Sequence, residues 1–292
     1  MIGATAFAAY CTRKESAAAA APLTGFRTVR GGAPGRELHP IGNGWTQALF
    51  DGPFYIRDAG APGLPAMSLV FVQSRDGDTV ASDPSTLGGG ETDKHLIYEG
   101  LSRVAADAVL AGASTARGLE TVFSVWHPQL VALRRECGKP RHPAQIVVTG
   151  SADLPIEEGL MFTTPELAAF VIARSGVVTA LRSRAHGRPW IEVIDAGEPL
   201  SMTAAMRHVH ARGRRVISAV GGRRTATSLI REGLVSDLYL TTSAITAGAP
   251  HTPFYVGEPP RLSSVLEKAG RGPESGVRFE HLLFRLASES VL

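Results

Sequence analysis

From Met67 onward, short apolar runs rich in β-branched residues alternate with segments that have a helical spacing of apolar residues. The runs are MSLVFVQS, ADAVLAG, AQIVVTG, AFVIA, WIEVID, RVISAVGG and DLYLTTSAI, and the helical segments include DKHLIYEGLSRVAA, HPQLVALRREC, VVTALRSRA, SMTAAMRHVHARG and TATSLIREGL. Strands that alternate with helices build a mostly parallel sheet covered on both faces. The run VRFEHLLFRLAS predicts a last, antiparallel strand. The sequence therefore predicts an α/β fold with a mostly parallel central sheet flanked by helices.

Residues 1–65 lack this alternation of strand-like and helix-like segments. The pieces GGAPGRELHP and DAGAPGLP are rich in glycine and proline, and a short amphipathic segment, WTQALFDGPFYI, lies between them. We predict an irregular N-terminal arm over 1–65, ordered by packing on the main body or on a second subunit, and a single domain over 66–292. Arg13, Lys14 and Glu15 follow the first apolar stretch, an order that is wrong for a secretory signal.

Charge and cysteine usage exclude several classes of protein. Thirty basic side chains stand against twenty-seven acidic ones, and the arginines are scattered, so we expect no nucleic-acid partner. No apolar run approaches the roughly 20 residues of a membrane span, so we expect a soluble protein with no membrane partner. With two cysteines outside any CxxC pair, we expect a reducing cytoplasm as its location. Cys11 and Cys137 lie far apart, and His208 and His210 are two residues apart on a predicted helix. We therefore predict no disulfide and no metal site.

Two turns after predicted strands have residues suited to a ligand, and ligands bind beyond the carboxyl ends of strands in open α/β sheets. The first runs from Gln73 to Ser82, although its Asp76-Gly77 pair fits a plain tight turn equally well. The second, from Leu87 to Lys94, has three glycines that let backbone N–H groups approach a ligand at a helix start. A flexible loop in which Thr92 or Asp93 caps the helix is the alternative.

Two further turns carry hydroxyls, glycines and arginines. Residues 111–118, AGASTARG, suit contact with a ribose or phosphate, although Ser and Thr are common in turns. Gly221 and Gly222 are followed by Arg223, Arg224 and a helix that we expect Thr225 or Thr227 to cap. Glycines, a helix N-terminus and arginines together favour a nucleotide phosphate, and solvated arginines on a turn are the alternative. The motif is neither G-x-G-x-x-G nor a P-loop, which indicates a different nucleotide-binding fold.

Taken in chain order, several segments resemble the reductase domain that forms the C-terminal half of bifunctional riboflavin-biosynthesis deaminase-reductases. These segments are SRDG, the Gly-rich loop, LSRVAADAVLAGAST, IVVTGSADL and GGRRTATSLIREGLVSDLYLTTSAITAG, and the resemblance runs from about Met67 to the end. It implies a dihydrofolate-reductase-like fold and a homodimer. It also implies NADPH-dependent reduction of a ribosylamino-pyrimidine phosphate, in which hydride transfer to an imine-like carbon opens the ribose ring.

The resemblance also implies roles for individual residues. Those placed at NADPH are Ser74, Thr115, Gly150, Ser151, Gly221, Gly222, Arg223, Arg224 and Thr225. Arg103 falls where the family binds the substrate phosphate, and Gly89 and Trp126 are expected beside the substrate, although a core tryptophan is the commoner use of Trp126. Candidates for a general acid that protonates the acceptor atom are Asp76, Lys94 and His95.

The chain departs from the family pattern at places that concern the substrate. Val220 stands where the family has a glutamate, and ARGLETVFSVWHP replaces an acidic D-D-P segment. The H-x-E and P-C-x-x-C motifs of the zinc deaminase half are missing from the sequence. We therefore expect a pyrimidine, a pterin or a related small electrophile as substrate. A non-catalytic NADP(H)-binding protein is one alternative. A dihydrofolate reductase proper is another, although its acidic substrate residue is not identifiable from the sequence.

Overall fold

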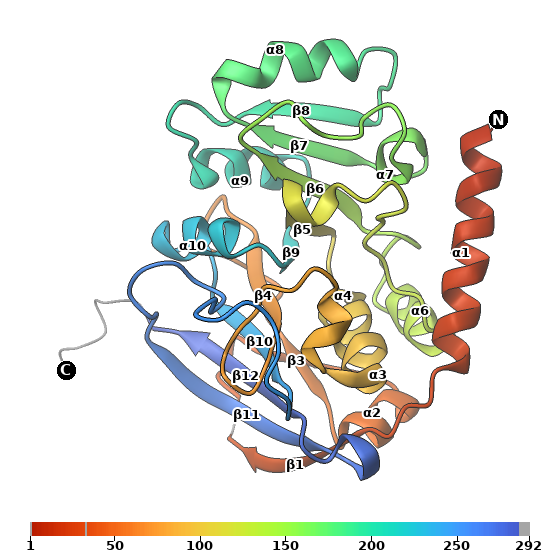
Figure 1. Cartoon of the computed structure of the whole chain (residues 1–292), viewed down its shortest axis with the longest axis vertical. Coiled ribbons are helices and arrows are strands. Elements are labelled where there is room, and N and C mark those ends of the chain that lie inside the picture. Colours follow the sequence, from red (N-terminus) through yellow and green to blue (C-terminus); the bar gives the residue numbers. More distant parts are fainter. Residues whose placement is uncertain (1, 33, 286–292) are drawn as a thin grey trace.

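The centre of the molecule is one ten-stranded sheet with the order β1-β11-β12-β10-β4-β9-β5-β6-β7-β8 (Figure 1). The computed structural model describes residues 2–32 and 34–285. The parallel strands, in sheet order, are β10 (Asp237–Thr242), β4 (Ala66–Gln73), β9 (Val216–Val220), β5 (Ala108–Gly112), β6 (Ala144–Thr149), β7 (Ala169–Ala173) and β8 (Ile191–Asp195). Three antiparallel strands complete it: β12 (Arg278–Phe284), β11 (Leu262–Gly270) and β1 (Phe26–Gly31). The prediction of a mostly parallel sheet with a last antiparallel strand is confirmed.

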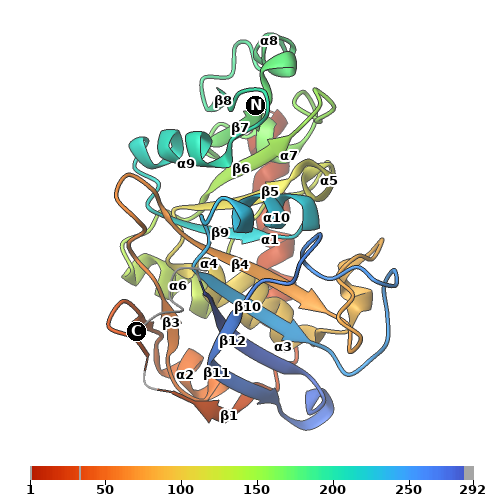
Figure 2. The same ribbon diagram turned by 90° about the vertical axis from the view of Figure 1, so that its left-hand side faces the viewer.

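Helices cover both faces of this sheet, and each face has its own hydrophobic core. Figure 2 shows how strongly the sheet twists between β8 at one end and β1 at the other. The first core receives side chains from α1 (Ile2–Ala20), α2 (Gly44–Phe50), η2 (Asp93–Leu101), α4 (Ser102–Val104), α6 (Pro128–Glu136), α7 (Leu160–Thr163) and α8 (Ser175–Arg184). The second receives them from α9 (Met202–Ala211) and α10 (Arg223–Arg231). Strands β5 and β7 are buried along their whole length because both faces are covered.

Shorter elements make up the connections. They are β2 (His39–Ile41) and β3 (Phe54–Ile56), which form a separate two-stranded sheet, and η1 (Pro84–Leu87), α3 (Gly90–Thr92), α5 (Ala113–Ala116) and η3 (Gly272–Glu274). Helix α6 begins at Pro128 behind His127, as the sequence predicts. Within the described ranges, no helix has the length and apolar character needed to span a bilayer.

The N-terminal segment is more regular than predicted. Residues 2–20 form α1, so the expectation of an irregular arm is wrong there. Alanine, which dominates this stretch, is the best helix former, and Phe7 and Tyr10 are buried in the first core. Strand β1 pairs with β11 at the sheet edge, which makes this segment part of the main sheet. Residues 57–65 have no helix or strand, as expected for a Gly/Pro-rich piece. The division at residue 65 stays a prediction.

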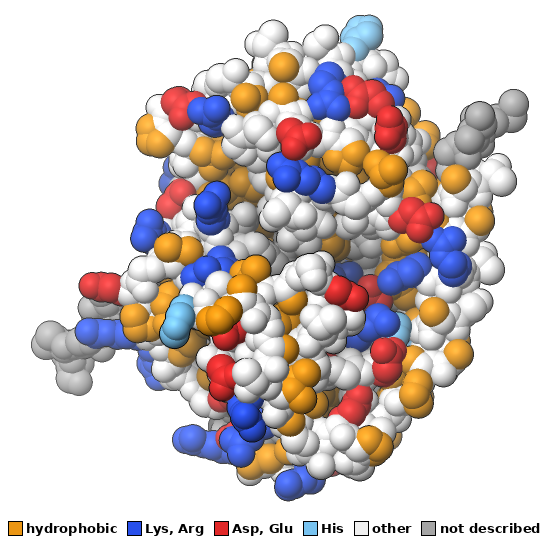
Figure 3. Space-filling view, in the orientation of Figure 1, with side chains coloured by type: hydrophobic (Ala, Val, Ile, Leu, Met, Phe, Trp, Pro, Cys, Tyr) orange, Lys and Arg blue, Asp and Glu red, His pale blue; other side chains and the backbone are white. Residues whose placement is uncertain are grey.

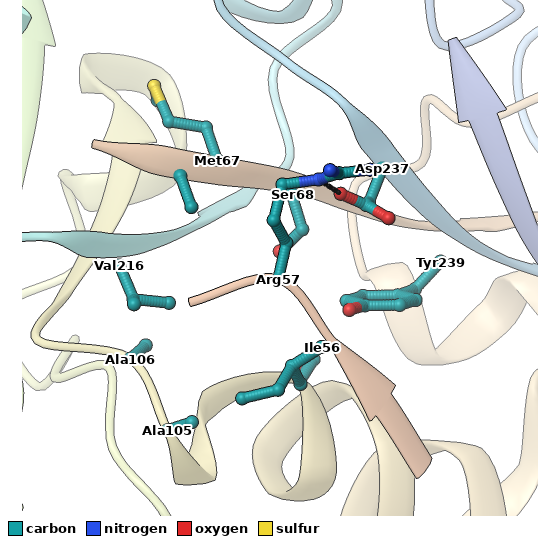
Figure 4. Close-up of a pocket in the computed structure, with 11 residues that line it drawn as sticks. Ile56, Arg57, Met67, Ser68, Ala105, Ala106, Val216, Asp237 and Tyr239 are labelled. Atoms are coloured by element: carbon teal, nitrogen blue, oxygen red, sulfur yellow. Dashed lines mark hydrogen bonds and ion pairs between the residues drawn. The ribbon is translucent and has the colours of Figure 1, made fainter. Parts of the chain in front are cut away.

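Polar side chains close the edge of the sheet where the parallel strands begin (Figure 4). Asp237 is buried, and its Oδ2 accepts a hydrogen bond from Arg57 Nε at 3.1 Å. His281 Nε2 lies 2.8 Å from the other oxygen, Oδ1. The cavity beside Arg57 has a volume of about 20 Å³, which is room for one water at most. This edge is therefore filled, and the opposite edge is the candidate for ligand binding.

Candidate functional site

Three of the turns that the sequence analysis singled out, and the turn at Gly150 and Ser151 that the resemblance implies, lie at the carboxyl-terminal edge of the sheet. They follow β4, β9, β5 and β6, which are consecutive neighbours and run parallel, so their carboxyl ends share one edge. The predicted cofactor residues on these turns are Ser74, Gly221, Gly222, Thr115, Gly150 and Ser151. Figure 3 shows the molecule hollowed near the middle of one face, between the part with α8 and β8 and the part with β11 and β12.

The turns after β5 and β9 touch each other. Gly221 and Gly222 have φ of +64° and +80°, in the left-handed region that favours glycine. A Cβ on Gly221 would lie 3.2 Å from Thr115 Oγ1, and a Cβ on Gly112 would lie 2.8 Å from Thr225 Oγ1. Side chains at these glycines would fill the surface between the two turns. Glycine leaves that surface free of side chains, so that a ligand can approach the backbone.

Helix α10 starts directly on this surface. Its N-cap is Gly222, and no side chain accepts a hydrogen bond at the cap, so the prediction that Thr225 or Thr227 caps the helix is wrong. Thr227 is engaged elsewhere, since its hydroxyl donates to the Arg223 carbonyl at 2.7 Å. The first N–H groups of a nine-residue helix therefore lack a side-chain partner. Such groups carry partial positive charge and suit an anion such as phosphate.

The two arginines after the glycine pair have different surroundings. Arg223 donates from Nε to the Pro253 carbonyl at 2.5 Å and from Nη2 to the Tyr255 carbonyl at 3.1 Å. Arg224 is exposed, and its guanidinium has no hydrogen bond or ion pair with any residue that the structure describes. Arg223 thus holds the 253–255 loop against α10. Arg224 is available to an anionic ligand.

The turn after β4 is held by hydrogen bonds between its own residues, Ser74 and Asp78. Ser74 is fully buried, and its hydroxyl accepts a hydrogen bond from the Asp78 N–H at 3.3 Å. Asp76 is exposed at the tip. Between this turn and residues 246–255 lies an open cavity of about 700 Å³, lined in part by Asp76 and His251. The structure therefore gives Ser74 a role in shaping the turn and places Asp76 at the rim of a cavity.

The turn after β6 presents an open, polar surface. Gly150 and Ser151 are exposed, and a Cβ on Gly150 would meet no atom within 4 Å. Thr149 fixes the backbone, because its hydroxyl donates to the Ser151 carbonyl at 2.6 Å and accepts from the Ser151 N–H at 3.1 Å. This arrangement leaves room beside the turn for a large group such as a nucleoside.

A buried carboxyl group lies beneath the Gly-rich loop, and the sequence analysis did not identify it. Asp93 is 3% exposed, and its Oδ1 accepts a hydrogen bond from the Thr241 hydroxyl. Burial, reinforced by the Glu274 carboxylate, raises the pKa of Asp93 to about 7. Helix α3 already begins at Gly90, so neither Thr92 nor Asp93 caps a helix there. No sequence signal distinguishes Asp93, because its neighbours Glu91, Thr92 and Lys94 are polar as well.

Lys94 points away from this carboxyl. Its Nζ lies 3.6 Å from Glu91 Oε2, and its side chain is 44% exposed. Gly89 is next to Asp93, because a Cβ on Gly89 would lie 3.0 Å from Asp93 Oδ2. Of the two predicted residues beside Asp93, Gly89 is therefore buried against its carboxyl group, and Lys94 is paired with Glu91 at the surface.

His95, Arg103 and Trp126 belong to a separate buried cluster between η2 and α1. His95 is 4% exposed, its Nε2 lies 3.0 Å from Glu91, and burial lowers its pKa. Arg103 donates to the Ser124 carbonyl at 3.0 Å, while its Nε and Nη2 have no partner in the described part of the chain. Trp126 is fully buried and packs edge-on against Tyr10, with ring centroids 5.5 Å apart. These side chains are enclosed, in contrast to the open turns after β6 and β9.

The residues along the carboxyl edge fit the diphosphate of a dinucleotide. A side chain at Gly221 would occupy the space next to Thr115. The N–H groups at the start of α10 have no side-chain cap, and the Arg224 guanidinium has no partner among the described residues. In the same part of the chain, no group of three or more His, Cys, Asp or Glu side chains is placed to hold a metal ion. The site thus has the chemistry of an anion cradle.

Solved structures with the same fold include a pyrimidine reductase-like protein from Corynebacterium diphtheriae. It is 23% identical to this chain with a TM-score of 0.64, and the match covers 76% of this chain and 92% of that one. RibD of Acinetobacter baumannii is 12% identical with a TM-score of 0.58, over 76% of this chain and 58% of its own. The riboflavin biosynthesis reductase of Saccharomyces cerevisiae is 14% identical with a TM-score of 0.53, over 76% and 91% of the two chains. At these identities the likeness shows the fold.

Comparison of sequences gives the family. No curated protein matches the chain. The model of the RibD C-terminal domain matches residues 65–271, which is more than half of the chain and includes all the turns described above. This match confirms the resemblance seen in the sequence. The protein belongs to the RibD C-terminal domain family.

Proposed function

We propose that the protein is an NADPH-dependent reductase that resembles 5-amino-6-(5-phosphoribosylamino)uracil reductase and acts on a pyrimidine, a pterin or a related small molecule. We further propose that it works as a cytoplasmic homodimer. The observation that carries the proposal is the contact between the Gly221–Gly222 turn and Thr115 beside the uncapped start of α10. The family membership and the reductases among the solved relatives support it.

Each part of the edge would hold one part of the cofactor. The N–H groups at the glycine pair and at the start of α10 would bind the diphosphate, and Arg224 would meet a phosphate. Thr115 would donate its hydroxyl from the neighbouring turn, and Gly150 and Ser151 would border the adenosine. Bound NADPH supplies a hydride. The protein would align the acceptor carbon of the substrate with C4 of the nicotinamide and would exclude water.

One observation keeps a second function open. Val220, where the resemblance implies a substrate glutamate, is a fully buried valine that pairs with Val70 on β4. A valine offers no polar contact to a substrate. This favours a changed substrate, and it equally suits a protein that binds NADP(H) without turnover.

Titration calorimetry with NADPH and NADH tests the cofactor. We expect the wild-type protein to bind NADPH, and we expect Arg224→Ala to weaken NADPH about 10-fold while changing NADH less, as for loss of one phosphate contact. Arg207→Ala is the matched control, because Arg207 is also exposed and has no side-chain partner among the described residues. Absence of heat with either nucleotide would contradict the proposal.

Turnover separates the two functions. NADPH oxidation is followed with a panel of aminopyrimidines, pterins and dihydrofolate. Oxidation with one of these compounds supports the reductase, and the preferred compound names the substrate class. Tight NADPH binding with no oxidation across the panel favours the non-catalytic protein.

A further inference from the structure

Helix α1 packs beside α6 and α7 on the outside of the first core (Figure 1). Three consecutive residues in its second half, Arg13, Lys14 and Glu15, each form an ion pair with a different segment. Lys14 Nζ lies 2.9 Å from Glu99 Oε1 on η2, and this pair is the least exposed of the three. The family model begins at residue 65, so α1 is an addition to the domain that the model matches.

Arg103, in the cluster between η2 and α1, is a buried cation without a counterion. It is 1% exposed, and its Nη1 donates to the Ser124 carbonyl at 3.0 Å. Its Cζ lies 4.7 Å from the ring centroid of Tyr98 and 5.7 Å from that of Phe123. Among the residues that the structure describes, no carboxylate pairs with its guanidinium. Buried cations are nearly always paired, so this position favours an anionic group from a ligand.

The free donors of Arg103 have the geometry that an oxyanion needs. Its Nε and Nη2 atoms are buried and lack a hydrogen-bond partner in the described part of the chain. These atoms share one edge of the guanidinium, and such an edge binds two oxygens of a carboxylate or a phosphate. Of the nine buried side-chain atoms without a partner in the described ranges, five belong to His95, Glu99, Arg103 and Trp126. Since buried polar groups rarely lack partners, this concentration marks a place for a ligand.

Helix α1 forms the outer wall of this cluster. The Tyr10 ring packs edge-on against Trp126, with centroids 5.5 Å apart, and Lys14 Nζ lies 5.8 Å from the centroid of Trp126. Trp126 is fully buried as a result. Ion pairs that are partly exposed stabilise a contact only modestly, so this wall can open at a small cost in free energy.

We propose that α1 is a lid over Arg103, which opens to admit a ligand and closes over its oxyanion group, a phosphate or a carboxylate. The resemblance already places Arg103 at a substrate phosphate, and the lid is what this chain adds. The Nε and Nη2 groups bind two oxygens of the ligand, and the Lys14–Glu99 pair holds the closed helix on η2. Because the oxyanion satisfies donors that are otherwise unpartnered under α1, its binding stabilises the closed position.

Cys11 of α1 reports opening of the lid, because it is half-buried while α1 is docked. Alkylation by iodoacetamide is followed by mass spectrometry, with the half-buried Cys137 at the end of α6 as the internal control. We expect Lys14→Ala to speed alkylation of Cys11 about 10-fold and to leave Cys137 unchanged. Arg13→Ala is the matched control. Its pair with Glu120 is exposed on both sides, so we expect a change of about two-fold or less.

Ribose 5-phosphate and benzoate are the ligand probes, one for each kind of oxyanion. Titration calorimetry gives the Kd of each probe, and alkylation is repeated at ten times that Kd. We expect the probe that binds to slow alkylation of Cys11 about 10-fold, because it binds only the closed position. Arg103→Lys loses the two-pronged donor edge and should lose this protection. Hydrogen exchange of the α1 amides gives the same readout without a thiol.

Each outcome decides the proposal. A probe that binds and leaves both Cys11 alkylation and α1 hydrogen exchange unchanged overturns the lid. Faster alkylation on binding also overturns it, since α1 would then be displaced by the ligand. Absence of heat with either probe, in the wild type and in Lys14→Ala, overturns the oxyanion site.

None of these measurements needs a nicotinamide, so the lid and the reductase fail separately. Protection of Cys11 by a probe, in a protein that binds no NADPH, supports the lid and overturns the proposed function. NADPH oxidation in a protein whose Cys11 gains no protection from a bound probe supports the reductase and overturns the lid.

Discussion

Thr115 Oγ1 lies 3.2 Å from the position that a Cβ on Gly221 would take. The two residues are far apart in the sequence, and they meet because β5 and β9 are parallel neighbours. Their contact joins two turns into one surface at the carboxyl edge of the sheet. The start of α10 lies at this surface without a side-chain cap, a feature that suits an anionic ligand.

Gly221→Ala tests the need for glycine in this contact. The substitution places a methyl group near Thr115 and forces alanine to adopt a φ of +64°, so we expect a loss of roughly 1–2 kcal/mol of folding free energy. Gly213→Ala is the control, because Gly213 has a φ of +79° with no atom within 4 Å of its Cβ position. Denaturant unfolding should show similar losses for both variants. Only Gly221→Ala should weaken NADPH, and an unchanged Kd would separate Gly221 from the cofactor.

Arg223→Ala should lower the stability of the fold, and Arg224→Ala should leave it almost unchanged. Arg223 donates two hydrogen bonds to the carbonyls of Pro253 and Tyr255, so its loss should cost about 1–2 kcal/mol of stability and loosen the 253–255 loop. Arg224 makes no such bonds, and its loss should leave the unfolding free energy within about 0.5 kcal/mol. Denaturant unfolding and limited proteolysis measure both effects. Equal stability of the two variants would show that the hydrogen bonds from Arg223 to the 253–255 loop do not stabilise the fold.

The free energy of unfolding should fall as pH rises from about 4 to about 7, because of the ionisation of Asp93. The folded pKa is about 7 and the ordinary value is 3.8, so the folded protein keeps a proton that the unfolded chain releases. This contribution is full below pH 4 and is lost as pH approaches 7, and it amounts to roughly 4 kcal/mol. Unfolding free energies of wild type and Asp93→Asn, measured across this range, should differ by an amount that changes with pH. A constant difference would show that Asp93 titrates normally.

Arg134→Met should be strongly destabilising. Arg134 is 1% exposed, and its Nη1 donates to the carbonyls of Arg103, Val104 and Ala106 at 2.7–3.0 Å. Methionine fills much of the same space and leaves the buried Val104 and Ala106 carbonyls without the guanidinium donor, while the Arg103 carbonyl keeps the Ala106 N–H, and we expect a cost on the order of 3 kcal/mol. Arg135→Met, at an exposed position on the same helix, is the control. Comparable thermal unfolding of the two variants would contradict this assignment.

Local patterns in the sequence were enough to predict eight of the ten strands in the sheet, but not β11 and β1. The apolar runs give the seven parallel strands and β12, because a strand covered on both faces is apolar along its length. The glycine pair at 221–222 predicts a turn after β9, and the structure gives both glycines a positive φ there. Phosphate binding at this turn stays a prediction. The prediction failed for α1, where the Gly/Pro-rich pieces farther along outweighed the helix propensity of alanine.

Contacts between distant segments decided the rest. Arg223 and Arg224 are adjacent in sequence, and only the position of the 253–255 loop distinguishes them. Asp93 resembles a helix cap in the sequence, and it is a buried acid because β4, β10 and Gly89 enclose it. Residue spacing encodes which face of an element is apolar. Burial, and the pKa that follows from it, depend on which other elements pack against that face.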